Sequence, residues 1–377
     1  MKKHKFSAPG RVEIGGNHTD HQCGLVLTAA IDLESVCIAS VNGTDTVQIT
    51  SDTLSPILVN LTDLKPRPSE AGTAASLVRG VAAWLNENGH NIGGFNGHVS
   101  SQIPIGAGLS SSASFEVLIG NVFKGLFGLS ISPLDIAIAG QFAENKYFGK
   151  PCGLMDQLAS SIGGLMMVDF QNRTSPVITQ IQSDFKGFSL CILDTGKNHS
   201  NLTDDYAEIP FEMKKIAMHF GKEVLREVDP KEFYSSIKSL RTYGDRAVLR
   251  AIHFFEENER VKKQTLALKN NDISEFLYLT TESGKSSLSY LQNIYRAAEP
   301  YEQGLTLALA ICEKFLGLKG AYRVHGGGFA GTVLAFIPEG MESDFYKLMS
   351  DIFGEKCCRF LNIRQKGGIE IMEEVHE

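Results

Sequence analysis

The 377-residue sequence lacks the features that would place it in several specialised classes. It has no run of the roughly 18 apolar residues that a membrane helix needs, and no apolar segment of a signal peptide follows its basic N-terminus. It has no cluster of lysine and arginine, and its net charge is −7, which disfavours nucleic acid and anionic membranes as partners. Its seven cysteines are odd in number and show no Cys-x-x-Cys spacing, so neither a disulfide framework nor a zinc site is expected. These absences favour a globular protein of the reducing cytoplasm.

The order of apolar and polar segments predicts two lobes that each mix helices with strands. The length and the 43% of hydrophobic residues suit about two domains. Periodicity and capping residues predict helices over residues 77–89, 111–127 and 132–147. Strands are expected near residues 47–50 and 95–103, with a hairpin turn at Asn42-Gly43. We therefore expect an α+β fold, with an N-terminal lobe over residues 1–180 and a helix-rich C-terminal lobe over residues 181–377.

The segment Pro104–Ser114, which reads PIGAGLSSSAS, contains the strongest signal for ligand binding. Gly106 and Gly108 allow a ligand to approach the backbone closely, and the following serines stand where a helix begins. The free N–H groups and the dipole of that helix end attract anions, and hydroxyls there suit Mg²⁺. No Gly-Lys-Ser/Thr closes the segment, so it is not a Walker A loop. A capped helix after a flexible turn remains the alternative.

A second glycine-rich segment, residues 326–331, formally satisfies the spacing Gly-x-Gly-x-x-Gly. A dinucleotide-binding fingerprint should open a helix, whereas the residues that follow, Thr332–Pro338, have the pattern of a strand. We therefore expect no Rossmann fold here, and a glycine loop that allows close approach for another reason.

Polar residues also gather in two further segments. The segment Arg11–His21 supplies an arginine, an amide, a carboxylate and histidines, which suit a polyhydroxylated ligand, although Asn17 and Asp20 taken singly also suit a turn. Asp156 lies in the sequence Cys-Gly-Leu-Met-Asp-Gln among apolar neighbours, where it suits either a general base or a helix cap. Glu144, twelve residues upstream, lies on an expected helix and by itself says little.

Together these motifs resemble the galactokinases, a family of the GHMP kinase superfamily, which also contains homoserine, mevalonate and phosphomevalonate kinases. Residues 8–20 are similar to the galactokinase signature, residues 104–114 to the superfamily's phosphate loop and residues 326–331 to its C-terminal glycine motif. Residues 152–157 and 204–206 add galactokinase-like details, so the resemblance spans residues 8–337. It implies a two-lobed GHMP-kinase fold with mixed sheets and helices in both lobes, and an active site in the cleft between the lobes.

The resemblance also implies roles for individual residues. Asp156 would take the proton from the anomeric hydroxyl of a sugar, or orient that hydroxyl, and Arg11 would stabilise the transferred phosphoryl group. The residues implied to line the sugar are Asn17, His18, Thr19, Asp20, Gly153 and Tyr206. Those implied to wrap the ATP phosphates are Gly106, Ala107, Gly108, Leu109, Ser110, Ser111 and Ser112. Ser112 and Glu144 would hold Mg²⁺. Phosphoryl transfer needs mainly positioning and charge stabilisation, which such a set supplies.

The resemblance is incomplete at position 17. Galactokinases usually have glutamate just before His-Thr-Asp, where it contacts the sugar near its C6 hydroxyl, and this chain has Asn17. The leading hypothesis is an ATP-dependent and Mg²⁺-dependent kinase that converts D-galactose to α-D-galactose 1-phosphate. The alternatives are an anomeric kinase for a C6-modified galactose such as galacturonate, and a catalytically silent sugar sensor. We expect a monomer that binds sugar and ATP, with neither nucleic acid nor membrane as partner.

Overall fold

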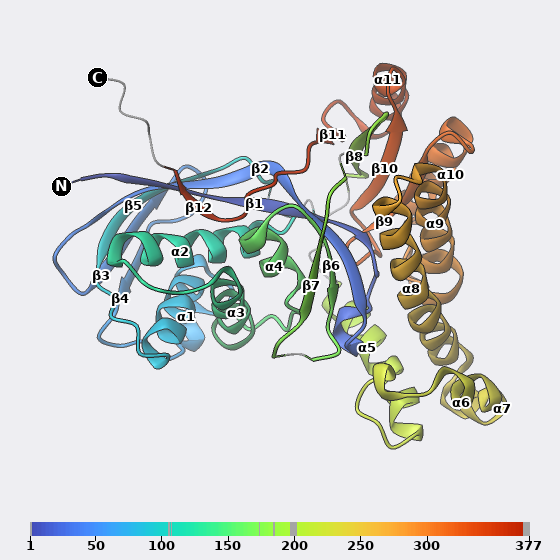
Figure 1. The fold of residues 1–377 in the computed structure, drawn as a ribbon, viewed down its shortest axis with the longest axis horizontal. Coiled ribbons are helices and arrows are strands. Elements are labelled where there is room, and N and C mark those ends of the chain that lie inside the picture. The colour runs from blue at the N-terminus through green and yellow to red at the C-terminus, as the bar shows by residue number, and fades with distance from the viewer. Residues whose placement is uncertain are drawn as a thin grey trace.

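The computed structural model describes residues 2–104, 106, 108–172, 174–183, 185–196 and 202–371, which form two β-sheets with helices packed on both (Figure 1). The strands are β1 (His4–Gly15), β2 (Leu25–Val41), β3 (Thr46–Ser51), β4 (Ile57–Asn60), β5 (Phe95–Ser101), β6 (Leu165–Asp169), β7 (Val177–Ile181), β8 (Phe188–Asp194), β9 (Ala321–His325), β10 (Thr332–Pro338), β11 (Cys358–Leu361) and β12 (Ile369–Ile371). The helices are α1 (Ala74–Glu87), α2 (Ser111–Phe127), α3 (Pro133–Ala143), α4 (Met155–Ile162), α5 (Thr203–His219), α6 (Pro230–Ser235), α7 (Ile237–Leu240), α8 (Asp245–Lys269), α9 (Ile273–Ser286), α10 (Gly304–Leu316) and α11 (Glu342–Phe353).

The first sheet has eight strands and contains most of the N-terminal half of the chain. Its order is β12-β1-β2-β5-β3-β4, with β6 paired to β2 and β7 paired to β6. Helices α1, α2 and α3 lie together against one face of it (Figure 1). Apolar side chains of β1, β3 and β5, including Phe6, Val47 and Phe95, pack against α1 and α2 in one buried cluster. This packing fixes the start of α2, and with it the segment that precedes α2.

The second sheet has four antiparallel strands in the order β11-β8-β10-β9. Helix α9 packs on β9 and against α8, and α10 contacts β9 and β10 (Figure 1). One buried cluster joins the two sheets. It includes Val12 and Leu27 of the first sheet, Leu334 and Phe336 of the second, and Phe276 of α9. The end of β1 and the turn between β9 and β10 are therefore held close to each other.

The helices that the sequence predicts are confirmed, with small shifts. Helix α2 has the predicted bounds, and α1 begins slightly earlier, after Thr73, whose hydroxyl accepts a hydrogen bond from the backbone N–H of Ser76. Helix α3 begins with the predicted cap, since Ser132 and Asp135 form a capping box. The predicted helix to residue 147 continues beyond α3 as a π-helix, η3 (Glu144–Phe148).

The hairpin predicted at Asn42-Gly43 is wrong. Strands β2 and β3 are not paired with each other, because β5 lies between them, antiparallel to β2 and parallel to β3. A strand from further along the chain thus takes the position that a local hairpin would give to β3. By contrast, the exclusion of a Rossmann fingerprint is confirmed, since residues 326–331 connect the antiparallel strands β9 and β10.

The chain crosses from the first sheet to the second between Ile181, which ends β7, and Phe188, which begins β8. Strand β12 then returns to the first sheet and pairs with β1. A division into lobes after residue 180 stays a prediction. No helix in the described ranges is both long enough and apolar enough to cross a membrane.

Candidate functional site

Arg11 and Asp156 form the centre of the candidate site. Arg11 Nε donates to Asp156 Oδ1 over 2.7 Å, and Nη2 donates to Oδ2 over 2.8 Å, a bidentate arrangement. Strand β1 shifts its register against β2 between Pro9 and Arg11, and such an irregularity re-aims the side chain at that point. The Arg11 side chain is 8% exposed and that of Asp156 31% exposed, so the carboxylate is the more accessible partner.

The electrostatic state of this pair follows from its surroundings. Desolvation would raise the pKa of Asp156, but the charge of Arg11 and the hydrogen bonds from Arg11 and Ser110 outweigh it and lower that pKa below its ordinary value. Asp156 is therefore ionised at neutral pH. An ionised carboxylate with a low pKa can orient a hydroxyl and attract its proton.

Ser110 links this pair to the loop before α2. Its hydroxyl donates to Asp156 Oδ2, and its backbone has the left-handed conformation, with φ of 58°. Ser110 occupies the N-cap position of α2, yet its side chain makes no capping hydrogen bond. The first N–H groups of α2 are consequently left without a side-chain cap, which is the arrangement that binds a phosphate.

The loop before α2 is tied to β1 by the backbone. Arg11 Nη1 donates to the carbonyl oxygen of Gly108 over 2.5 Å. The backbone N–H of Arg11 donates to the carbonyl oxygen of Leu109 over 3.3 Å. Gly106 and Gly108 have positive φ angles of 81° and 70°, which favour glycine. Ala107, also expected to contact phosphates, lies outside the described residues. Ser111 begins α2 and Ser112 follows it.

Ser112 and Glu144 lie together as expected for a metal site. Ser112 Oγ donates to Glu144 Oε1 over 3.2 Å, and Glu144 is 3% exposed. Behind them, Gln157 Nε2 donates to Glu144 Oε2 and to Glu116 Oε2, each over 2.9 Å. Within the described part of the chain, Glu116 Oε1 is buried and has no hydrogen-bond partner. The Ser112 hydroxyl and the Glu144 carboxylate, beside this oxygen without a partner, fit Mg²⁺, which binds through few protein oxygens and keeps places for water and substrate phosphates.

Burial and like charge explain the state of the inner carboxylate. Desolvation, followed by the charge of Glu144, raises the pKa of Glu116 well above its ordinary value. Both effects favour the protonated form of Glu116. Glu144, which bonds Ser112, faces the N-terminus of α2.

Four of the predicted sugar-binding residues, Asn17 to Asp20, lie on the loop after β1, whereas Gly153 precedes α4 and Tyr206 is in α5. Asp20 is partly exposed and packs against Gly153, where a Cβ atom would come within 1.9 Å of Asp20 Oδ2. Only glycine fits at position 153 while Asp20 keeps this place. Desolvation raises the pKa of Asp20 to about 6, and the charge of Asp156 adds to this effect. Two carboxylates of the site thus influence each other.

His18 and Tyr206 meet the glycine loop between β9 and β10. A ring nitrogen of His18, Nε2, lies 2.9 Å from the carbonyl oxygen of Gly327, and the Tyr206 hydroxyl donates to Gly328 over 3.1 Å. A Cβ at Gly327 would come within 2.4 Å of the Tyr206 ring. Burial lowers the pKa of His18 to about 4, so its ring is neutral at pH 7. The glycine loop therefore holds His18 and Tyr206 in place.

Asn17 and Thr19 have a different setting from the other predicted sugar-binding residues, because both are fully buried. Asn17 Nδ2 donates to Glu13 Oε1 and to the carbonyl oxygen of Gly326, each over 2.8 Å, and its Oδ1 accepts from Asn293 over 2.8 Å. The Thr19 hydroxyl is within hydrogen-bond distance of the backbone oxygens of Gly16 and Leu25. Their polar atoms already have partners within the protein, so these two side chains stabilise the loop from its buried side.

Sequence reasoning missed the residues that support this loop. Arg323 Nη2 donates to Glu13 Oε1 over 2.9 Å, and Arg323 is fully buried. Burial raises the pKa of Glu13 to about 7 despite the opposing charge of Arg323. His325 Nε2 accepts from the backbone N–H of Glu13 over 3.0 Å. A charged residue within an apolar strand, as at Glu13 and Arg323, is the signal that could have identified them.

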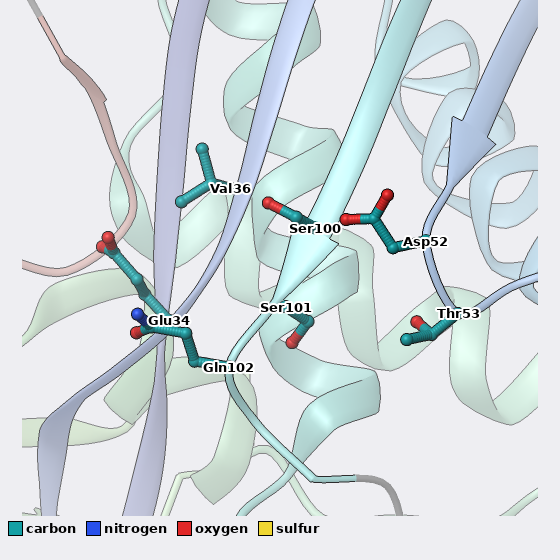
Figure 2. Close-up of a pocket in the computed structure, with 7 residues that line it drawn as sticks. All are labelled: Glu34, Val36, Asp52, Thr53, Ser100, Ser101 and Gln102. Carbon is teal, nitrogen blue, oxygen red and sulfur yellow. The ribbon is translucent and has the colours of Figure 1, made fainter.

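A separate hollow lies on the first sheet and contains none of the predicted site residues. It is lined by Glu34, Val36, Asp52, Thr53, Ser100, Ser101 and Gln102 (Figure 2). Glu34 is paired with Arg364, and Ser101 Oγ lies 2.9 Å from Ser35 Oγ. Asp52 Oδ1 in turn lies 3.3 Å from His98 Nε2, and the two carboxylates of the hollow disfavour an anionic ligand.

Comparison with protein families identifies two regions of the chain. The model of the galactokinase galactose-binding signature matches residues 2–41, and that of the GHMP kinases N terminal domain matches residues 76–164. The chain is also similar to the galactokinase of Glaesserella parasuis serovar 5 (strain SH0165). The two are 31% identical over 353 residues, which cover 91% of this chain and 88% of that protein.

Solved structures show the same fold. The galactokinase of Lactococcus lactis complexed with galactose has a TM-score of 0.86 and 24% identity, covering 98% of this chain and 95% of that chain. The mevalonate kinase of Methanococcus jannaschii has a TM-score of 0.68 and 19% identity, covering 97% of this chain and 99% of that chain. These likenesses confirm the fold class predicted from the sequence, a two-lobed α+β fold of the GHMP kinases.

Proposed function

This chain belongs to the galactokinase family, and from that premise we propose that it transfers the γ-phosphoryl group of ATP to the anomeric hydroxyl of D-galactose. The product is α-D-galactose 1-phosphate. One observation carries the proposal: the ionised pair of Asp156 and Arg11 lies directly beside the uncapped N-terminus of α2. A group that orients a hydroxyl and a group that binds phosphates therefore share one site.

Asp156 acts on the acceptor in this proposal. Its carboxylate is held by Arg11 and Ser110 and remains partly exposed, so it can accept a hydrogen bond from the sugar hydroxyl. Its low pKa suits an anion that orients the hydroxyl and receives the proton only as the oxygen–phosphorus bond forms. Arg11 then compensates the negative charge that spreads over the transferred group.

ATP is placed by the loop that leads into α2. The phosphates meet the backbone from Gly106 to Ser112, where positive φ angles, the absence of a side-chain cap and the helix dipole favour an anion. Ser112 and Glu144 would hold Mg²⁺, which supplies positive charge to the phosphates when bound. Groups of the chain itself position the sugar and the rest of the nucleotide.

The sugar lies between Asp156 and the loop after β1. Asp20 and His18 are partly exposed and offer a carboxylate and a neutral ring, and Tyr206 closes the side formed by the glycine loop. Asn17 and Thr19 support these residues from the buried side. The neutral Asn17 amide already has protein partners, so it exerts little repulsion or attraction on a group at C6.

The test is ADP release with ATP and Mg²⁺ against D-galactose, galacturonate, galactosamine, N-acetylgalactosamine and glucose. We expect the highest turnover with D-galactose. Highest turnover with galacturonate would make the chain an anomeric kinase for an acidic sugar. ADP release that no sugar stimulates, from a preparation that binds galactose, would identify a sugar sensor.

A further inference from the structure

We propose that Lys150 is a nucleotide-binding residue whose ammonium group pairs with Glu144 in the free protein and with the ATP phosphates once Mg²⁺ occupies Glu144. This inference rests on the proposed function and adds a residue to it. Its basis is the position of one lysine directly beside the carboxylate that faces the phosphate-binding helix end.

The backbone places Lys150 over Glu144. The chain leaves the π-helix η3 at Gly149, which has a φ of 87°, and turns back on itself. The backbone N–H groups of Gly149 and Lys150 donate to the carbonyl oxygen of Glu144 over 3.1 and 3.2 Å. This tight turn brings Lys150 Nζ to 3.4 Å from Glu144 Oε1.

The two partners differ strongly in exposure. The Glu144 side chain is 4% exposed, whereas that of Lys150 is 65% exposed. The ammonium group therefore reaches the buried carboxylate from the solvent side. A ligand that arrives from solvent at Glu144 meets Lys150 first.

The oxygen that Lys150 contacts is the same one that Ser112 contacts. Glu144 Oε1 accepts from Ser112 Oγ over 3.2 Å and from Lys150 Nζ over 3.4 Å. A divalent cation held by Ser112 and Glu144 competes with the ammonium for that oxygen, because two cations at one oxygen repel each other. Binding of ATP with Mg²⁺ thus frees the ammonium and brings polyphosphate oxygens beside it. A lysine is a compact cation on a flexible stem and suits such an exchange.

The arrangement of charges at the site also favours a role for Lys150 in binding the ATP phosphates. Arg11 is held to Asp156 by two hydrogen bonds, whereas Lys150 contacts Glu144 through one longer bond of 3.4 Å from a side chain that is 65% exposed. The positive charge of Lys150 helps to lower the pKa of Asp156, in addition to its contact with Glu144. An ordinary surface ion pair, by comparison, would contribute little to the stability of the fold and would have no effect on nucleotide affinity.

The test is calorimetric titration of the full chain with a non-hydrolysable ATP analogue in Mg²⁺, and separately with Mn²⁺ alone. The matched control is Lys146→Met, because Lys146 lies four residues earlier, within η3, and its ammonium is over the Phe142 ring, 4.6 Å from the ring centre. We expect Lys150→Met to weaken analogue binding by about ten- to a hundredfold, the usual effect of losing a hydrogen bond to a charged group. We expect the same variant to bind Mn²⁺ alone several-fold more tightly, since Glu144 loses its competing cation. Lys150→Arg should retain most of the analogue affinity.

Equal analogue affinity in Lys150→Met and the wild-type chain would overturn this inference, as would an equal loss in Lys146→Met. Weaker Mn²⁺ binding in Lys150→Met would also contradict it, because removal of a competitor cannot weaken the metal. A wild-type chain that binds no analogue at all would instead overturn the proposed function. Both variants are compared by their binding affinities, so the test does not depend on catalytic turnover.

Discussion

Arg11 and Asp156 are joined by two parallel hydrogen bonds although 145 positions separate them in the sequence. One lies on β1, at the point where the strand shifts its register, and the other on the first turn of α4. The pair is also bonded to the phosphate loop, through Gly108 and Ser110.

Replacement of Asp156 by asparagine should abolish most of the turnover. The amide keeps the shape of the side chain but cannot attract a proton, and it presents one acceptor to Arg11 instead of two. We expect kcat to fall by about 10²- to 10⁴-fold, the range for loss of a general base or oriented anion. Steady-state kinetics checks this, with circular dichroism to show that the variant is folded. An unchanged kcat would remove Asp156 from the mechanism.

Replacement of Glu144 by glutamine should raise the Mg²⁺ concentration needed for half-maximal rate. Glutamine keeps the size and shape of the side chain, but it removes the charge that attracts the cation and leaves one acceptor oxygen in place of two. Ser112→Ala should have the same direction of effect and a smaller size. Titrating Mg²⁺ at fixed ATP and sugar measures both variants. If neither variant changed the metal dependence, the assignment of these two oxygens would be refuted.

Sugar binding should weaken in acid with a midpoint near pH 6. Burial raises the pKa of Asp20 to about 6, so below that pH the carboxylate becomes protonated and a poorer acceptor for sugar hydroxyls. We expect kcat/KM for the sugar to fall about tenfold for each pH unit below the midpoint. In Asp20→Asn the value should be low throughout and this acid limb absent.

The same pKa shift affects folding in the opposite direction. A carboxyl group whose pKa is raised in the folded protein contributes stability at low pH, and that contribution is lost as the pH rises through 6. Titration of Asp20 therefore does not unfold the chain in acid. A loss of sugar affinity below pH 6 that persisted unchanged in Asp20→Asn would have another origin.

Asn17→Asp should destabilise the protein. A carboxylate at this position would lose the hydrogen bonds that Asn17 Nδ2 donates to Gly326 and Glu13 and would face two acceptors instead. We expect a loss of about 2–4 kcal/mol in the free energy of unfolding, typical of an unsatisfied buried charged group. Urea denaturation measures it. The control Asn86→Asp, on the exposed side of α1, should change stability by less than about 0.5 kcal/mol. Equal effects of the two substitutions would refute the role given to the buried network.

The sequence predicts best those features that are set by neighbouring residues. The bounds of α2 follow from the glycines and serines before it and the apolar period within it, and the start of α3 follows from Ser132 and Pro133. The segments that carry Arg11, Asp156 and Glu144 are also recognisable, because each contains an unusual set of polar residues. Their assembly into one site is not visible in any single segment.

What the sequence could not predict depends on contacts between distant residues. The hairpin at Asn42-Gly43 is replaced because β5 competes for the edge of β2, a choice that no local turn signal reveals. The burial of Asn17 depends on Asn293, which lies 276 positions away. In the sequence Lys150 has the features of an ordinary surface lysine, and only the turn after η3 brings it beside Glu144.

Transfer of the phosphoryl group to the anomeric oxygen is tested most directly by observing the bond that forms. The protein is incubated with ATP, Mg²⁺ and D-galactose labelled with ¹³C at C1, and the product is examined by ³¹P nuclear magnetic resonance. We expect a new phosphate monoester signal that is split by coupling to the labelled carbon. An unsplit monoester signal would place the phosphate on another hydroxyl, and inorganic phosphate as the sole product would show that the chain is not a sugar kinase.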